Sequence, residues 1–280
     1  MSIVSFWSPG KEETGKTSAV IALATHMSIE HNYRILVIST SFNDNSMKNA
    51  FWKEEKARRN LGLFGPNTNV AMQNGVEGLN RFIKSNKVSP DIITNYTKIV
   101  FKDRLEILLG YNGEEKYYNE LKTSYSAIIE LANSYYDLVM VDVDSKLDED
   151  IQKEILHKSD LIVATMAQRL SSINKYNEAK EQNQILNSPK TLILIGRYDR
   201  FSKYTTKNIT RYLRERNEVN GVPYNTLFFE ACEEAGVPDL FLKLRKISDD
   251  TDRNWLFLKE IQRLSDNIIY RLQDLQMRKG

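Results

Sequence analysis

The stretch "SPGKEETGKTS" (residues 8–18) decides how the first part of this chain folds. A short apolar run, "IVSFW" (3–7), precedes it, and a helical pattern over 16–30 follows it. The spacing G-x-x-x-x-G-K-[ST], which binds phosphate between a strand and a helix, is matched by Gly10, Gly15, Lys16 and Thr17. Main-chain N–H groups and the helix dipole would then face the anion. The stretch therefore predicts a strand, a phosphate-binding loop and a helix.

Each loop residue has an expected role. Gly15 lets the main chain approach the phosphates, Lys16 neutralises β- and γ-phosphate oxygens, and the Thr17 hydroxyl helps to hold Mg²⁺. The nucleotide-binding set that we expect is Gly10, Lys11, Thr14, Gly15, Lys16, Thr17 and Ser18. The alternative is a chance match at a turn. Glu12 and Glu13 would repel a polyphosphate unless they point outward or pair with a base.

Further apolar runs of strand length occupy residues 34–39, 137–143, 160–166, 191–196 and 225–230. They are nearly continuous in apolar residues, which is typical of parallel strands buried on both faces. We therefore predict an α/β fold: a doubly wound, mostly parallel sheet flanked by helices, of the P-loop NTPase type.

Between these runs, helical patterns are expected at 44–56 and 76–84, and a short helix opens at Ser89-Pro90. Residues 98–111 read as a hairpin-like or extended pair. No Pro/Gly/Ser-rich linker interrupts the chain. We predict one nucleotide-binding domain over 1–280, with an elaboration at about 43–119.

The bulk composition is that of a globular protein, with 41% hydrophobic and 27% charged residues among 280. A net charge of +2 gives no argument for nucleic acid or membrane. Cys232 has no second cysteine with which to pair, which fits a reducing compartment. We expect a cytoplasmic protein without a membrane span, because no signal-peptide pattern and no apolar run of about 18 residues is seen.

Read as K-x-x-x-G-K-T, Lys11 to Thr17 resembles the deviant Walker A loop of the ParA/MinD family of ATPases. In that family the first lysine contacts the partner subunit's phosphates in a nucleotide-sandwich dimer. The resemblance thus implies ATP, Mg²⁺, a homodimer around ATP and a catalytic role for Lys11; otherwise Lys11 is a solvated loop lysine. The family's K-G-G-x-G-K-[ST] has glycines where Glu12 and Glu13 stand. Within the family the chain resembles the TadZ/CpaE-like branch in particular, because that branch tolerates altered nucleotide motifs.

A later segment, "YDLVMVDVDS" (136–145), resembles the family's Walker B strand. The resemblance implies that Asp142 acts on Mg²⁺ and belongs to the catalytic set, with Asp144 as a weaker alternative. A carboxylate at a strand end beside a phosphate loop suits metal-assisted phosphoryl transfer. The other interpretation is a surface acid at the end of a strand.

Other family positions depart from the pattern. Ser39 and Ser41 stand where the family has two aspartates, and Asp44 is the nearest substitute. Gly196 stands where many relatives have an asparagine that reads adenine, and Pro238 is expected in a loop near the base. Nucleotide binding with slow or absent hydrolysis follows as an expectation.

Two surface features bear on partners. A basic helix face, with Ile209, Tyr212 and Leu213 opposite it, carries Lys203, Lys207, Arg211 and Arg214. It could contact DNA phosphates, although we favour an ordinary solvated face because acidic residues dilute it. The segment 255–277 is amphipathic with mixed charges, which favours packing on the sheet or a second subunit over a membrane surface.

Three functions remain open from the sequence. The first is an ATP-dependent dimerising ATPase switch that partitions or positions DNA or a protein machine. The second is a catalytically weak or inactive nucleotide-binding scaffold that acts by docking to proteins. The third is a small-molecule or nucleotide kinase, for which no Arg-rich lid or acceptor site is recognisable.

Overall fold

The computed structural model describes residues 1–53, 75–85 and 89–278. In this part of the chain an eight-stranded sheet has the order β3-β4-β2-β5-β1-β6-β7-β8. The strands are β1 (Ser2–Trp7), β2 (Ile35–Ser39), β3 (Lys98–Phe101), β4 (Leu105–Leu108), β5 (Leu138–Asp142), β6 (Leu161–Ala167), β7 (Thr191–Tyr198) and β8 (Asn220–Pro223). Neighbouring strands are parallel except β3 and β4, which pair antiparallel. The predicted mostly parallel sheet and the hairpin-like pair at 98–111 are confirmed.

Helices connect most of these strands. They are α1 (Lys16–Glu30), α2 (Ser46–Asn49), α4 (Val76–Lys84), α5 (Glu115–Leu121), α6 (Tyr125–Asn133), α7 (Glu149–Lys158), α8 (Leu170–Gln182), α9 (Thr206–Tyr212), α10 (Thr226–Glu233), α11 (Val237–Leu244) and α12 (Arg253–Met277). Short 3-10 helices span Pro90–Asn95, Lys122–Ser124 and Gln184–Asn187.

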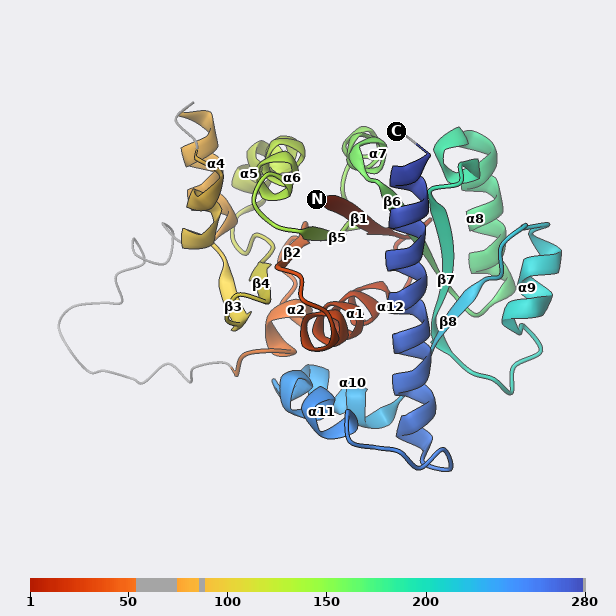
Figure 1. Cartoon of the computed structure of the whole chain (residues 1–280). Coiled ribbons are helices and arrows are strands. Elements are labelled where there is room, and N and C mark those ends of the chain that lie inside the picture. Colours follow the sequence, from red (N-terminus) through yellow and green to blue (C-terminus); the bar gives the residue numbers. More distant parts are fainter. Residues whose placement is uncertain (54–74, 86–88, 279–280) are drawn as a thin grey trace.

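The helices form a layer on each face of the sheet (Figure 1). On β5, Val139 and Val141 join a core with α4 to α9, whereas Leu138 and Met140 join the core that contains α1, α11 and α12. Successive side chains of a strand point to opposite faces of the sheet. When helices cover both faces, the side chains on each face must be apolar. This double burial is why the strands read as continuous apolar runs.

The expected strand at 225–230 is wrong. The last strand is β8, and the run from Thr226 forms α10 instead. Asn225 caps this helix, because its side chain accepts a hydrogen bond from Phe228 N at 2.9 Å. Phe228 is buried while Leu227 and Phe229 are exposed, so the apolar run does not lie inside a sheet.

Two expected helices are shorter than their patterns. Within 44–56, helix α2 covers only Ser46–Asn49, and residues 54–56 lie outside the described residues. Helix α9 covers only Thr206–Tyr212, and it begins there because Thr205 caps it by accepting a hydrogen bond from Asn208 N. Lys203 and Arg214 therefore lie outside the helix, and the expected basic helix face of four residues is wrong.

The C-terminal helix α12 packs against α1 and β8, as its mixed charges predicted. Its buried apolar side chains are Phe257, Ile261, Leu264, Ile268 and Leu272. The apolar stripe is therefore covered by the protein's own core. Within the described residues, none of the helices combines the length and the apolar content that crossing a bilayer requires.

Candidate nucleotide site

The loop at 8–15 connects the end of β1 to the first turn of α1. Gly15, immediately before the helix, has φ +75°, the left-handed conformation that glycine adopts without steric cost. The end of β7 lies directly behind it: a Cβ added at Gly196 would lie 2.1 Å from the carbonyl oxygen of Thr14. The phosphate loop thus rests on a strand whose residue at this point must lack a side chain.

Three side chains of the predicted site meet beneath this loop. Lys16 Nζ lies 3.1 Å from Asp142 Oδ1 and also donates to the carbonyl oxygen of Val143. Thr17 Oγ1 donates a hydrogen bond of 2.7 Å to Asp142 Oδ2. The Lys16 and Asp142 side chains are 10% and 5% exposed, so the charge pair is withdrawn from water. Sheet register explains the meeting, because β5 pairs with β1 and puts Asp142 beside Phe6.

The donor set of this cluster fits a nucleotide-bound Mg²⁺. Asp142 Oδ1 is buried and accepts no hydrogen bond of proper geometry among the described residues. A hydroxyl and a carboxylate oxygen are hard ligands, and Mg²⁺ commonly takes one or two such protein ligands with phosphate oxygens and water completing its shell. In the described residues no group of three or more His, Cys, Asp or Glu side chains could hold a metal by itself.

The neighbouring strand end carries a serine pair in place of carboxylates. Ser39 and Ser41 are hydrogen-bonded to each other, Oγ to Oγ, at 2.9 Å. Asp44 is exposed and accepts a hydrogen bond of 2.7 Å from Ser46 N in the turn that leads into α2. Asp44 is thus engaged at a helix start, and Asp142 supplies the carboxylate that contacts the lysine and threonine of the phosphate loop.

Thr40 contacts the main chain at the C-terminal end of the predicted Walker B segment. Its hydroxyl donates to the carbonyl oxygen of Asp142 at 3.1 Å and accepts from Asp144 N at 2.8 Å. Tyr118 donates to the Thr40 carbonyl oxygen at 3.0 Å, which connects α5 to the same point. Sequence reasoning missed Thr40, since a buried threonine after an apolar run carries no recognisable signal.

The two loop glutamates pair with bases on neighbouring elements. Glu12 contacts Arg169 (Oε2 to Nη2, 2.7 Å) and Lys175, and Glu13 contacts Arg197 (Oε2 to Nη1, 3.0 Å). Hydrogen bonds from Lys175 and then Arg169 lower the pKa of Glu12, so its carboxylate is the stable form. The sequence left these partners unidentified, because β6, α8 and β7 lie far away along the chain.

Lys11 is exposed on the surface of the loop. No hydrogen bond or ion pair of its side chain is found within the described part of the chain, unlike its neighbours Glu12 and Glu13. Its ammonium is therefore accessible to a ligand or to a second molecule.

A narrow cleft of about 20 Å³ adjoins the loop on the side of β7 and β8. Its lining includes Gly15, Ser18, Arg197, Tyr224 and Phe229. Arg197 lies over the Phe229 ring, with its guanidinium carbon 5.9 Å from the ring centre. Pro238, expected in a loop near the base, lies instead in the first turn of α11, because proline is well tolerated there.

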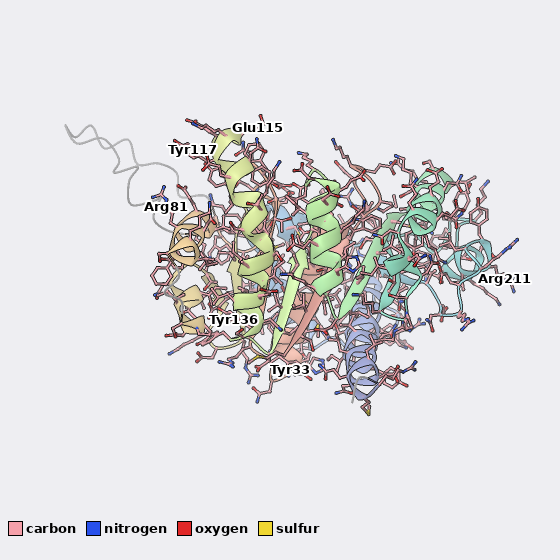
Figure 2. All side chains as sticks on the ribbon, turned by 90° about the horizontal axis from the view of Figure 1, so that it is seen from above. Tyr33, Arg81, Glu115, Tyr117, Tyr136 and Arg211 are labelled. Carbon is pink, nitrogen blue, oxygen red and sulfur yellow. The ribbon has the colours of Figure 1, made fainter. Side chains whose placement is uncertain are left out.

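The basic residues of the possible DNA surface are all exposed: Lys203, Lys207, Arg211 and Arg214. Arg211 projects into solvent at one edge of the molecule (Figure 2). Tyr212, expected on the face of the helix opposite the basic residues, is 57% exposed and donates to Asn174 Oδ1 at 2.7 Å. Ile209 and Leu213 fill the inner face of this short helix, which leaves Tyr212 outside.

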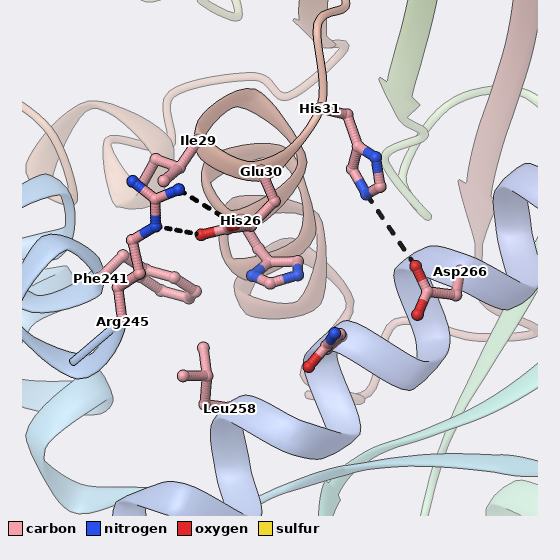
Figure 3. A pocket seen from close by; sticks show the side chains of 9 residues that line it. His26, Ile29, Glu30, His31, Phe241, Arg245, Leu258 and Asp266 are labelled. Atoms are coloured by element: carbon pink, nitrogen blue, oxygen red, sulfur yellow. Dashed lines mark hydrogen bonds and ion pairs between the residues drawn. The ribbon is translucent and has the colours of Figure 1, made fainter. Parts of the chain in front are cut away.

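A second cavity, of about 420 Å³, lies between α1, α11 and α12 (Figure 3). His26 lines it and is only 5% exposed, and its Nε2 has no hydrogen-bond partner among the described residues. Burial lowers the pKa of His26. At the rim, Glu30 pairs with Arg245 at 2.8 Å, and His31 Nε2 lies 4.0 Å from Asp266.

The fold is shared with solved ATPases, although no protein-family model and no curated protein matches the sequence. A ParA family ATPase from Chlorobium tepidum superposes with a TM-score of 0.70 at 16% identity, over 94% of this chain and 97% of that one. MinD from Pyrococcus horikoshii, in complex with Mg-ADP, superposes with a TM-score of 0.64 at 13% identity, over 94% of this chain and 95% of that one. A putative plasmid partition protein from Borrelia burgdorferi bound to AMPPNP superposes with a TM-score of 0.60 at 17% identity, over 100% of this chain and 99% of that one. The chain therefore has the ParA/MinD fold.

Proposed function

We propose that this protein is an ATP-binding switch of the ParA/MinD kind, which dimerises around Mg²⁺-ATP and so partitions or positions DNA or a protein machine. The observation that carries the proposal is the meeting of Lys16, Thr17 and Asp142 under the loop, with Lys16 Nζ 3.1 Å and Thr17 Oγ1 2.7 Å from the Asp142 carboxylate. The solved structures of the same fold with Mg-ADP and AMPPNP support the choice of nucleotide.

Each residue has a role in this proposal. Loop main-chain N–H groups and the start of α1 receive the phosphates, and Lys16 neutralises their charge. Thr17 and Asp142 hold Mg²⁺, which when bound draws charge from the phosphate oxygens. Lys11, exposed and unpaired among the described residues, contacts the phosphates bound by the second subunit.

The experiment compares the wild type with Lys11→Ala in Mg²⁺ and a non-hydrolysable ATP analogue. Analytical ultracentrifugation reports dimerisation, and calorimetry at low protein concentration reports nucleotide affinity. We expect an ATP-dependent wild-type dimer and a Lys11→Ala protein that binds nucleotide as a monomer. A wild type that stays monomeric with bound nucleotide would contradict the switch.

A second candidate is a nucleotide-binding scaffold with weak or no hydrolysis. The serine pair favours it, because Ser39 and Ser41 bond to each other and offer no carboxylate to orient an attacking water. Phosphate release from Mg²⁺-ATP separates the candidates. Release that Lys16→Ala abolishes would reject the scaffold, and nucleotide binding without release would support it.

A further inference from the structure

The phosphate loop is fastened to α8 through Glu12. This carboxylate lies 2.7 Å from Arg169 Nη2 and also accepts from Lys175, so two cations share it. Its side chain is 17% exposed, whereas those of Arg169 and Lys175 are 56% and 47% exposed. Arg169 stands at the start of α8 and Lys175 within it, so both bases come from one helix.

The same lysine also covers the residue before Lys11. A Cβ built on Gly10 would lie 3.6 Å from Lys175 Cδ, so the stem of Lys175 lies over Gly10 while its ammonium binds Glu12. Both residues that flank Lys11 therefore lie against side chains of α8: Gly10 beneath the stem of Lys175, and Glu12 through its carboxylate. Lys11 itself remains exposed between these two contacts.

We propose that Glu12 is a positioning residue, whose ion pairs with Arg169 and Lys175 hold the loop so that Lys11 projects toward the phosphates of a second subunit. This inference rests on the proposed function. A pair of glycines at 12 and 13 would leave the main chain many conformations to lose on binding. A loop fastened in one conformation avoids part of that ordering cost, which raises affinity without adding a contact.

Glu13 provides the matched control. It is 85% exposed and has one partner, Arg197, which is 41% exposed. Exposed pairs of this kind contribute little, because water and salt screen them. The same chemical change at two adjacent residues therefore separates a positioning effect from a general loss of loop charge.

The test compares wild type, Glu12→Gln, Glu13→Gln, Lys175→Met and the double variant Glu12→Gln/Lys175→Met. Calorimetry measures binding of a non-hydrolysable ATP analogue to dilute monomer, and sedimentation measures dimerisation with the same analogue and Mg²⁺. We expect Glu12→Gln to weaken dimerisation by about tenfold or more, as for loss of a charge-assisted hydrogen bond. Its monomer affinity for nucleotide should change by less than about twofold, and Glu13→Gln should match the wild type on both measures.

The double variant shows whether Glu12 acts through Lys175. If it does, the double variant dimerises no worse than Glu12→Gln, since Glu12→Gln by itself already removes the contact with Lys175. The inference is overturned if Glu12→Gln dimerises like the wild type, if Glu13→Gln loses as much, or if nucleotide affinity falls in step with dimerisation. A wild type that binds nucleotide and does not dimerise overturns the inference and the proposed function together. If the wild type dimerises with nucleotide and Glu12→Gln dimerises equally well, only the inference is overturned and the proposed function stands.

Discussion

Thr17 Oγ1 and Asp142 Oδ2 lie 2.7 Å apart, although 125 positions separate the two residues in the chain. The contact joins the first turn of α1 to the end of β5. It forms because β1 and β5 are parallel neighbours whose carboxyl ends meet at one edge of the sheet, where α/β proteins bind their ligands. A hydroxyl and a carboxylate at this distance form one side of a site for a small, hard cation.

Thr17→Val tests the hydroxyl. In Mg²⁺ we expect the ATP affinity of this variant to fall by about tenfold, because a hydroxyl that can bind the metal is replaced by a methyl group. Thr17→Ser keeps the hydroxyl and should stay within about twofold of the wild type. Calorimetry in Mg²⁺ and in EDTA measures the difference. Equal Mg²⁺ dependence in Thr17→Val and Thr17→Ser would exclude Thr17 from the metal site.

The buried pair of Lys16 and Asp142 predicts a stability effect that is separate from binding. Lys16→Met leaves the Asp142 carboxylate buried without its cation, which we expect to cost about 3 kcal/mol of unfolding free energy. Lys16→Met/Asp142→Asn removes both charges and should recover most of that loss. Urea unfolding without nucleotide measures both variants and the single variant Asp142→Asn. A double variant as unstable as the sum of the single losses would show that the two charges are not coupled.

Local patterns predicted the strand, loop and helix of the candidate nucleotide site, because the requirements of such a loop lie within one short segment. Gly15 needs a left-handed conformation, and Lys16 and Thr17 begin the helix. The apolar runs predicted most of the sheet for a similar reason: strands with both faces covered are apolar at every position. The run at 225–230 is the exception, since one cap at Asn225 converts such a run into a helix.

The partners of the loop glutamates could not be found from local patterns. Arg169, Lys175 and Arg197 reach Glu12 and Glu13 only because β6 and β7 follow β1 in the order of the sheet. The requirement for glycine at Gly196 is hidden in the same way, since it arises from the main chain of Thr14. In both cases the contact depends on which strands are neighbours in the sheet. Recognising each strand from its own sequence is not enough to predict that order.

His26 predicts how stability depends on pH. Burial lowers its pKa from the ordinary value of 6.5, so the unfolded chain takes up a proton more readily than the folded one. Stability gained from neutral His26 is present above the unfolded pKa and is lost as pH falls toward the folded pKa. The charged or titratable groups that line the cavity with it are Glu30, His31, Arg245 and Asp266. Between about pH 7 and pH 5 we therefore expect stability to fall in the wild type.

His26→Leu should show a smaller fall over the same range, because its side chain cannot be protonated. His157→Leu is the control: it removes an exposed imidazole and should keep the wild-type pH dependence. Urea midpoints at a series of pH values measure all three proteins. If His26→Leu and His157→Leu have the same pH dependence as the wild type, His26 does not carry the effect.

Gly196→Ala tests the support beneath the phosphate loop. The new Cβ would lie 2.1 Å from the Thr14 carbonyl oxygen, a main-chain atom that can move only with the loop. We expect unfolding free energy to fall by about 1–3 kcal/mol, as for other overpacked sites, and ATP affinity to fall with it. Gly236→Ala is the matched control, because its Cβ would meet its nearest atoms at 3.5 Å, an ordinary contact. Thermal unfolding and calorimetry should leave Gly236→Ala near the wild type; a Gly196→Ala protein that is equally unaffected would show that β7 does not hold the loop in place.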